Sequence, residues 1–243
     1  MQHLLRRKII HIVILLACPL LGFSQLRDGI NQPDFDNKDF HFGINAGFNQ
    51  SHFRFTHHDV FLGQDSVMSV ESINSAGINL AWLVNVNLGE HFDLRTFPLD
   101  LTFSEKAFQY ALTYPNQELD ETPLTIKKVQ SITLSVPVDI KFTSDRIGNM
   151  KVFMVGGMRF DYDLAASASG DKNADAIIKL KKTNINAEGG LGFHLYFPYF
   201  VLSPELKVDW GLSNLHNRVG DNKFSNVIDK IYSRMISFSL TIE

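Results

Sequence analysis

One polar segment near the C-terminus contains residue types that are able to do catalytic chemistry. Ser213, His216 and Asp221 supply a nucleophile, a base and an acid within a few residues of one another, which are the groups that a hydrolase or an acyltransferase needs. Polar segments often contain this combination by chance, and nothing in the sequence fixes the geometry among the three side chains. We therefore expect no catalytic residue and no enzymatic activity.

A second segment contains possible metal ligands. His57 and His58 are followed by Asp59, and His52 precedes them by five positions. Imidazole and carboxylate groups are ligands for transition metals. Histidines in a polar segment are usually solvated, and His194 further along is better explained as a hydrogen-bonded interior residue than as a catalyst. We expect no metal ion and no cofactor.

A larger set of charged residues occurs at every second position along several segments, on the polar side of each. Burial of this polar side would require the charges to be paired or solvated. We predict that they pair inside the protein and close its interior, and the alternative is a gate that responds to protons or ions. The predicted interior network comprises Asp93, Arg95, Asp139, Lys141, Lys151, Arg159, Asp161, Glu188, Glu205, Lys207 and Asp209.

The segments that position these charges alternate apolar and polar residues with a period of two, which predicts β-strands. The sequence has 44% hydrophobic and 12% aromatic residues, with 20 phenylalanines, and aromatic residues favour strands. A phase slip near Thr96-Phe97-Pro98 predicts a β-bulge. The eight predicted strands cover about 40–48, 76–88, 92–103, 131–142, 151–163, 184–197, 200–210 and 236–243.

The connections between these strands alternate in length. Short ones are predicted at Leu88–His91, Ser144–Asn149 and Pro198–Tyr199, and long ones at Ser51–Ile73, Ser104–Lys127, Ala165–Lys182 and Gly211–Ser233. An even number of strands with this alternation is typical of an outer-membrane barrel. We predict an all-β fold, an eight-stranded antiparallel transmembrane β-barrel with short periplasmic turns and long extracellular loops.

The sizes of the side chains indicate which face of the strands points outward. A soluble lipocalin-like barrel would also have eight strands, with its apolar face inside. The interior of an eight-stranded barrel is narrow, and the polar face here consists largely of small residues that would fit it. The apolar face is crowded with large aromatic residues, which we expect to contact lipid. These are Trp82, Phe92, Phe142, Phe160, Phe193, Phe197 and Trp210.

The N-terminus has the organisation of a secretory signal peptide. Arg6-Arg7-Lys8 is followed by an apolar run at Ile9–Leu21, about thirteen residues and thus shorter than the roughly 20 of a transmembrane helix. We predict a signal peptide at residues 1–25, a periplasmic segment at 26–39 and the barrel domain at 40–243. Cys18 is the only cysteine and should leave with the signal peptide, because the residues after it are apolar, unlike those of a lipoprotein.

The charge of the chain excludes one class of function. Its net charge is −3, and loss of the three bases in the signal peptide leaves 20 Lys and Arg against 26 Asp and Glu, or −6. A mildly acidic chain without a basic stripe is not expected to bind nucleic acid. We expect a protein of the cell outer membrane, surrounded by outer-membrane lipid. Whether lipopolysaccharide binds at its rim is left open.

Several strings of the sequence resemble those of PorT proteins. They lie at Phe103–Lys106, Tyr110–Leu112, Lys127–Val129, Ser144–Met150, Tyr196–Phe200, Ser203–Glu205, Phe224–Lys230 and Ser233–Arg234. The resemblance covers about Phe40–Glu243 and is closest from Ser144 onward. It implies an outer-membrane component of the type IX secretion system, required to export proteins with C-terminal sorting domains, and it supplies no catalytic motif.

We expect the long loops to carry this function, since loops commonly carry binding residues on a rigid scaffold. Phe224–Arg234 is amphipathic and suited to docking other secretion components or cargo, and Ser104–Tyr114 is a second such segment. The alternative is that their apolar residues only pack the loops onto the rim. The predicted partner-binding residues are Phe224, Asn226, Val227, Ile228, Asp229, Lys230, Arg234, Glu105, Lys106 and Tyr110.

Two other functions remain open at this point. One is a small barrel enzyme, and the other is a structural surface barrel with no part in secretion. The role of the first long connection, Ser51–Ile73, is also open.

Overall fold

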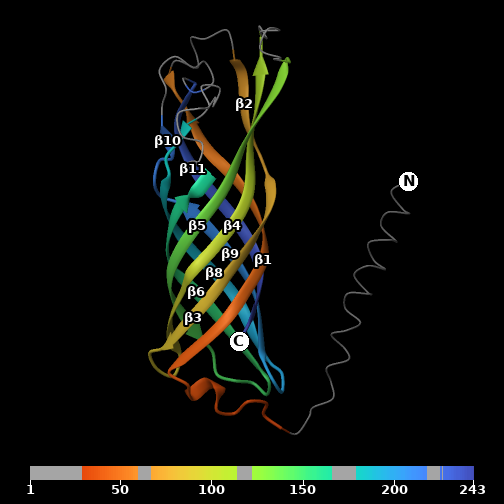
Figure 1. Ribbon diagram of the computed structural model, residues 1–243, viewed down its shortest axis with the longest axis vertical. Coiled ribbons are helices and arrows are strands. Elements are labelled where there is room, and N and C mark those ends of the chain that lie inside the picture. The colour runs from red at the N-terminus through yellow and green to blue at the C-terminus, as the bar shows by residue number, and fades with distance from the viewer. Residues whose placement is uncertain (1–28, 60–66, 114–121, 166–178, 218–224, 226) are drawn as a thin grey trace, which may run out of the picture.

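A computed structural model describes residues 29–59, 67–113, 122–165, 179–217, 225 and 227–243 (Figure 1). The predicted signal peptide, Asp221, Phe224 and Asn226 lie outside these residues. No helix in the described part of the chain has the length and hydropathy needed to cross a membrane.

Eight strands form a closed antiparallel ring, as the sequence predicted. Each strand pairs with its neighbour along the ring, and the first strand pairs with the last. The strands are β1 (Phe40–His57), β3 (Ser75–Asn87), β4 (Phe92–Leu112), β5 (Leu124–Thr143), β6 (Met150–Asp163), β8 (Thr183–Tyr196), β9 (Val201–Gly211) and β11 (Ile228–Ile242).

Shorter elements extend the two ends of this ring. At one end β2 (Val67–Ile73) pairs with the outer part of β4, and β7 (Lys179–Leu180) pairs with β10 (His216–Asn217). At the other end the chain makes a short 3₁₀ helix, η2 (Phe35–Asn37), before it enters β1. Figure 1 shows this N-terminal segment crossing the end of the barrel where the short turns lie.

The turns and the bulge agree with the sequence prediction. Residues 88–91, 144–149 and 197–200 join consecutive strands at one end. The ladder between β4 and β5 shifts register between Thr96 and Asp100, where the bulge was predicted. Closure leaves no unpaired edge along the membrane-spanning part, which a lipid environment requires because it offers backbone groups no hydrogen-bond partner.

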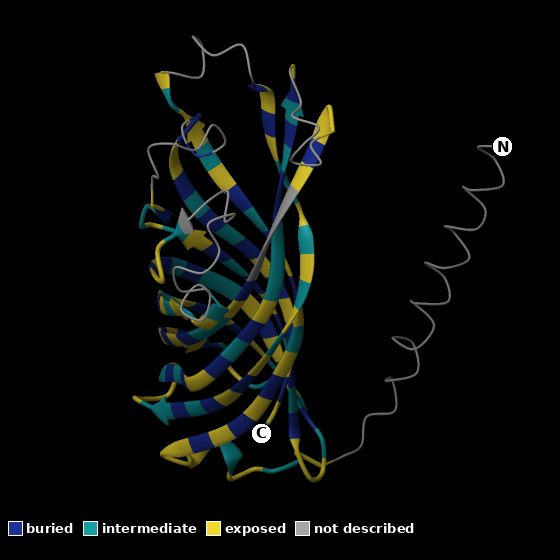
Figure 2. Cartoon of the chain, turned by 45° about the horizontal axis from the view of Figure 1, so that its top comes forward, coloured by how far each residue is buried: buried dark blue, intermediate teal, exposed yellow. Residues whose placement is uncertain are grey.

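The outer wall is apolar, as predicted from side-chain size. Trp82, Phe92, Phe160 and Trp210 are exposed on its surface, whereas Phe197 lies in a turn. Exposed and buried residues alternate along each strand, which appears as bands in Figure 2. A wall of exposed large apolar residues is stable only in lipid.

The predicted long loops are partly wrong, because five of the strands occupy much of them. β1 continues to His57, β4 continues to Leu112, β5 begins at Leu124, β11 begins at Ile228, and β2 lies inside the predicted first loop. The reason is an inversion of the alternation. Phe48 faces outward but Phe53 faces inward, so the apolar face of β1 changes sides and the period-two signal is lost.

Glycines on the inner face make room inside this narrow ring. A Cβ atom at Gly157 would collide with the Val138 carbonyl oxygen and with the Asp139 carboxylate. The preceding residue, Gly156, faces the opposite side, where a Cβ would meet nothing within 4 Å. Two adjacent glycines therefore differ in the space around them.

We predict that Gly157→Ala destabilises the folded barrel by about 1–3 kcal/mol, because overpacking forces the β5 backbone or Asp139 to move. Gly156→Ala is the matched control and should leave stability within about 0.5 kcal/mol, as expected of a surface site. Urea titration of the refolded barrel in lipid vesicles measures both. Equal effects of the two substitutions would contradict the inward placement of Gly157.

Candidate functional site

The lumen contains the predicted charge network, arranged in layers along the barrel. In the central layer the Nη1 atom of Arg95 lies 2.6 Å from Oε2 of Glu205, across the barrel from β4 to β9. Lys207 Nζ lies 3.0 Å from Glu188 Oε1 and 3.5 Å from Asp139 Oδ2. All five side chains are buried, so strands that are not neighbours are joined by charge through the interior.

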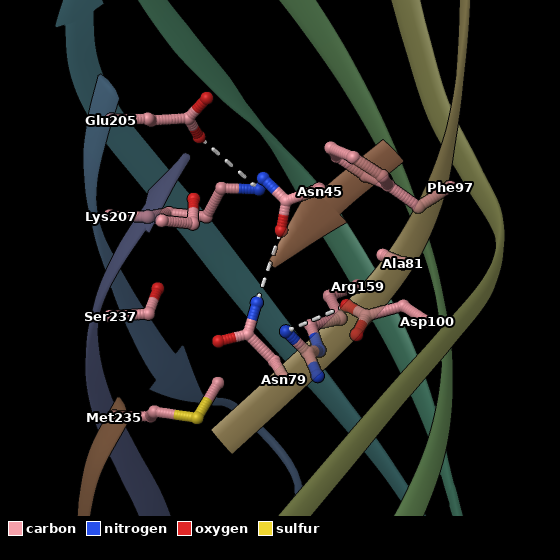
Figure 3. Close-up of a pocket in the computed structure, with 11 residues that line it drawn as sticks. Asn45, Asn79, Ala81, Phe97, Asp100, Arg159, Glu205, Lys207, Met235 and Ser237 are labelled. Carbon is pink, nitrogen blue, oxygen red and sulfur yellow. Dashed lines mark hydrogen bonds and ion pairs between the residues drawn. The ribbon is translucent and has the colours of Figure 1, made fainter. Parts of the chain in front are cut away.

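A second layer surrounds Arg159 on β6. Its Nε atom lies 2.8 Å from Asp161 Oδ1 and its Nη1 atom lies 3.3 Å from Asp100 Oδ2. Its Nη2 atom donates hydrogen bonds to the hydroxyls of Thr102 and Ser135. The guanidinium is therefore satisfied on every side, and Figure 3 shows Arg159 and Asp100 side by side.

The layer nearest the periplasmic end includes Asp93, Lys141 and His194. Lys141 Nζ lies 2.7 Å from Asp93 Oδ2. His194 is buried and shares a hydrogen bond of 2.7 Å with the Ser203 hydroxyl. This places His194 in the interior, where the sequence analysis expected it. Of the remaining predicted members, Asp209 on β9 lies opposite Glu188 on β8. Its carboxylate oxygens have no hydrogen-bond partner among the described residues, so Asp209 does not pair as predicted.

The extracellular end of the lumen is filled by apolar side chains, which we call the apolar cap. Lys106 marks the boundary, because its Nζ atom donates to the Ser233 hydroxyl and lies 4.9 Å from the centre of the Phe53 ring. The Phe53 and Phe108 rings stack beyond it with their centres 5.0 Å apart. The apolar cap comprises Phe53, Val67, Val70, Phe108, Tyr110, Leu112, Leu215, Val227, Ile228 and Ile231.

The periplasmic end is closed by the segment before β1, which we call the N-terminal latch (residues 31–39). Asp36 Oδ1 accepts a hydrogen bond of 2.6 Å from the Tyr196 hydroxyl and lies 3.0 Å from Lys151 Nζ. Arg146 donates to the carbonyl oxygens of Asn31 and Gln32, and its guanidinium lies 3.7 Å from the centre of the Tyr196 ring. The latch thus joins the turn before β6 and the end of β8.

The electrostatics of the latch favour an ionised Asp36. Partial burial by itself would raise the pKa of this carboxyl, but the hydrogen bond from Tyr196, together with the positive charges of Lys151 and Arg146, outweighs it and holds the pKa below its ordinary value. The ionised form is therefore the one that holds the latch closed at neutral pH.

Very little space remains between these layers. One cavity has a volume of about 20 Å³ and is lined by residues that include Asn45, Asn79 and Lys207 (Figure 3). Another, of about 30 Å³, lies behind the latch beside His41 and Glu243. Each has room for about one or two water molecules. In the described part of the chain, the side chains of the charge network and of the apolar cap occupy the lumen around these two cavities.

The predicted partner-binding residues do not form one exposed surface. Tyr110, Val227 and Ile228 are completely buried in the apolar cap, and Lys106 points into the barrel. The prediction that Lys106, Tyr110 and Ile228 are loop residues is wrong, because Lys106 and Tyr110 belong to β4 and Ile228 belongs to β11. Val227 lies in a turn, as predicted, but it is buried because the inner face of the barrel becomes apolar there, so none of the four forms a docking surface.

The other predicted members that the structure describes face outward on strands. Asp229 and Lys230 are exposed on β11, and Arg234 is half-buried on the same strand. Glu105 is half-buried on β4. These four are strand residues and not loop residues, and they lie on two separate strands.

The candidate catalytic residues have separate partners. Ser213 donates to Asn184 and accepts a hydrogen bond from the Ile185 backbone. His216 contacts the Ser225 hydroxyl and the Asp229 carbonyl oxygen. These contacts attach β10 and its neighbouring turn to the barrel, and they do not bring Ser213 to His216.

The candidate metal ligands also diverge. His52 faces outward in the extracellular half of β1, and His57 lies at the outer end of the same strand. Within the described residues, no group of three or more His, Cys, Asp or Glu side chains is arranged to hold a metal ion.

The predicted network omitted four charged residues of the interior, which are Asp36, Asp100, Lys106 and Glu243. Asp36 lies outside the periodic segments, Glu243 is the last residue of the predicted strand at 236–243, and the alternation around Lys106 had already been lost. The one available signal was the reappearance of Phe53, Phe108 and Tyr110 at alternate positions with the opposite phase.

This geometry agrees with comparison to known sequences. A model of the outer membrane protein beta-barrel domain matches residues 23–217. The chain belongs to this family. It is therefore an outer-membrane β-barrel protein. No sequence among the curated proteins matches it.

Solved structures with a similar fold are distant in sequence. The outer membrane protein OprG of Pseudomonas aeruginosa has a TM-score of 0.42 and 11% identity, over 83% of this chain and 92% of that one. Neisserial surface protein A has a TM-score of 0.40 and 9% identity, over 84% and 99%. The outer membrane protease OmpT of Escherichia coli has a TM-score of 0.33 and 10% identity, over 82% of this chain and 95% of that one.

We predict that the refolded barrel shows no steady open channel in planar lipid bilayers, because the ion pairs, the apolar cap and the latch fill its lumen. Single-channel recording over both polarities measures this. A porin refolded in the same way is the positive control. A persistent conductance of the intact barrel would support the gate rather than the closed lumen.

We predict that Asp36→Asn loosens the latch and speeds tryptic cleavage after the exposed Lys38 by about tenfold, because hydrogen bonds to a charged group contribute about 1.5–3 kcal/mol and cleavage follows the open population. The lowered pKa gives the sign of the pH effect. The contribution of Asp36 is fully present above its unfolded pKa and is lost as the pH falls through the lower, folded value.

Asp34→Asn is the matched control, since Asp34 is exposed and makes no side-chain cap to η2. It should cleave at the wild-type rate. Equal cleavage of all three proteins would show that Asp36 does not hold the latch.

Proposed function

We propose that this outer-membrane barrel is an accessory protein of type IX secretion, required for export of cargo with C-terminal sorting domains. It acts through protein contacts at its extracellular end and not by conducting cargo. The observation that carries the proposal is the filled lumen, since the pairs of Arg95 and Lys207 and the apolar cap leave cargo no route through the barrel. The resemblance of Phe40–Glu243 to PorT proteins supplies the secretion pathway. Export through a cleaved signal peptide at residues 1–25 is part of the proposal.

A surface suited to such contacts lies at the outer end of β2, β4 and β5. Met68, Leu124 and Ile126 are exposed by 68%, 60% and 52%. They face outward around Ala111, which pairs with Ser69 on one side and with Leu124 on the other. We call these four residues the tip patch.

Lipid does not explain the exposure of the tip patch. Leu124 precedes Ile132 by eight residues on β5, toward the extracellular end of the strand. Ile132 is exposed on the apolar wall. At about 3.3 Å per residue and a tilt of about 45°, this raises Leu124 roughly 19 Å above Ile132, beyond the reach of acyl chains. Exposed apolar residues outside the membrane are typical of a protein interface, and here the occupant is another component of the secretion system.

We predict that Leu124→Glu together with Ile126→Glu lowers export of a sorting-domain cargo at least about tenfold, because an apolar contact that buries two such residues contributes several kcal/mol. The measurement is cargo in the culture medium, in a bacterium with type IX secretion whose own copy of this gene is deleted and replaced by the variant. Heat-modifiable migration on electrophoresis checks that the variant barrel is folded.

Thr56→Glu is the matched control, because Thr56 is exposed at the outer end of β1, away from the tip patch. It should export normally. If the deletion itself leaves export unchanged, the protein has no role in secretion and a structural barrel is the better description. If the deletion stops export but the double variant exports normally, the docking surface lies elsewhere.

A further inference from the structure

The outward faces of β1 and β11 change character abruptly toward the extracellular end. Below this point the paired residues are apolar, as with Phe48 opposite Phe238. Beyond Gln50 and Ile236, which also pair, the outward residues become basic. We call the resulting cluster the basic rim patch, and it consists of His52, Arg54, Lys230 and Arg234.

The register places these side chains together. His52 pairs with Arg234, and Arg54 and Lys230 follow at the next two outward levels, opposite Tyr232 and Thr56. Residues directly opposite on antiparallel strands have Cβ atoms about 4.5–5.5 Å apart. Arg54, opposite Tyr232, lies diagonal to both Arg234 and Lys230, so these permanent positive charges are near neighbours and repel one another.

Acidic residues do not compensate this repulsion. β1 contains no Asp or Glu, and β11 contains one, Asp229, at its outer end. The acids of the adjoining β9, Glu205 and Asp209, are buried in the lumen. Among the described residues, no carboxylate forms an ion pair with any member of the basic rim patch. The cluster keeps a net positive charge of about two.

The lower part of the patch, His52 and Arg234, lies at the height of the lipid headgroups. Arg234 pairs with Trp210, an exposed aromatic residue of the kind that marks a membrane interface. Ile236 is the last outward apolar residue of β11 below the patch, and His52 and Arg234 lie two residues beyond it, roughly 5 Å higher. Arg54 lies roughly 9 Å and Lys230 roughly 14 Å above Ile236. The headgroup layer on each side of the hydrocarbon is about 5–8 Å thick.

We propose that the basic rim patch binds the phosphate groups of lipopolysaccharide in the outer leaflet. The patch faces lipid on the side of the barrel that carries the long connections, which is the extracellular side of an outer-membrane barrel, and lipopolysaccharide is the phosphorylated lipid of that leaflet. Each guanidinium is able to donate two parallel hydrogen bonds to a phosphate. Tyr232 and Trp210 contact the boundary between sugar and acyl chain.

The proposal is tested with bisphosphorylated lipid A and the mature full-length barrel in detergent micelles, by native mass spectrometry. Arg54→Gln together with Arg234→Gln should weaken lipid A binding about 25-fold, from about fivefold for each cation near an anionic surface. Arg54→Lys with Arg234→Lys should retain most of the binding. Both pairs of side chains point away from the lumen, so heat-modifiable migration should not change.

Lys181→Gln with Lys182→Gln is the matched control. Both lysines are exposed at the same end of the barrel, so this variant loses the same charge at a different place and should bind lipid A within about twofold of the wild type. Dephosphorylated lipid A should bind weakly and equally to all variants. Equal weakening by the two glutamine variants, no weakening by either, or phosphatidylglycerol binding as tight as that of lipid A would overturn the proposal. None of these results depends on a role in secretion.

Discussion

The barrel depends on one constraint, which is that the polar groups inside a sheet closed in lipid must be paired, and the ion pair between Arg95 and Glu205 is the main example. Lipid offers no hydrogen-bond partner to the backbone, so the sheet must close. Closing eight strands leaves an interior that side chains must fill and satisfy. Because Arg95 lies on β4 and Glu205 on β9, the charge that would be costly to bury alone is paired only when distant strands have come together. Lys207 with Asp139, and Arg159 with Asp100, also join strands that are not neighbours in the ring.

The two ends of the lumen are closed by different physical means. The periplasmic end depends on charge, with Asp36 held by Tyr196 and Lys151. The extracellular end depends on apolar packing, with Phe53 stacked on Phe108. The apolar cap instead gives the part of the barrel outside the membrane a hydrophobic core of the ordinary kind.

A filled interior leaves the outer surface as the place where this barrel meets other molecules. Two surfaces stand out at different heights and on different strands. The tip patch on β2, β4 and β5 is apolar and lies above the membrane, so it fits a protein. The basic rim patch on β1 and β11 is cationic and extends upward from the headgroups, so it fits a phosphorylated lipid. The wall between them serves burial in the membrane.

The sequence by itself determined the eight membrane-spanning strands, their short turns and the outward direction of residues such as Trp82, because lipid and a narrow lumen impose one alternation along each strand. It also indicated that Arg95 and Glu205 face inward, although not that they are partners, since pairing depends on which strands face each other across the ring. Only the tertiary structure showed that β1 and β4 continue beyond the membrane. There the solvent is water again, the apolar face turns inward at Phe53 and Phe108, and Ile228, expected at a docking surface, becomes part of a core.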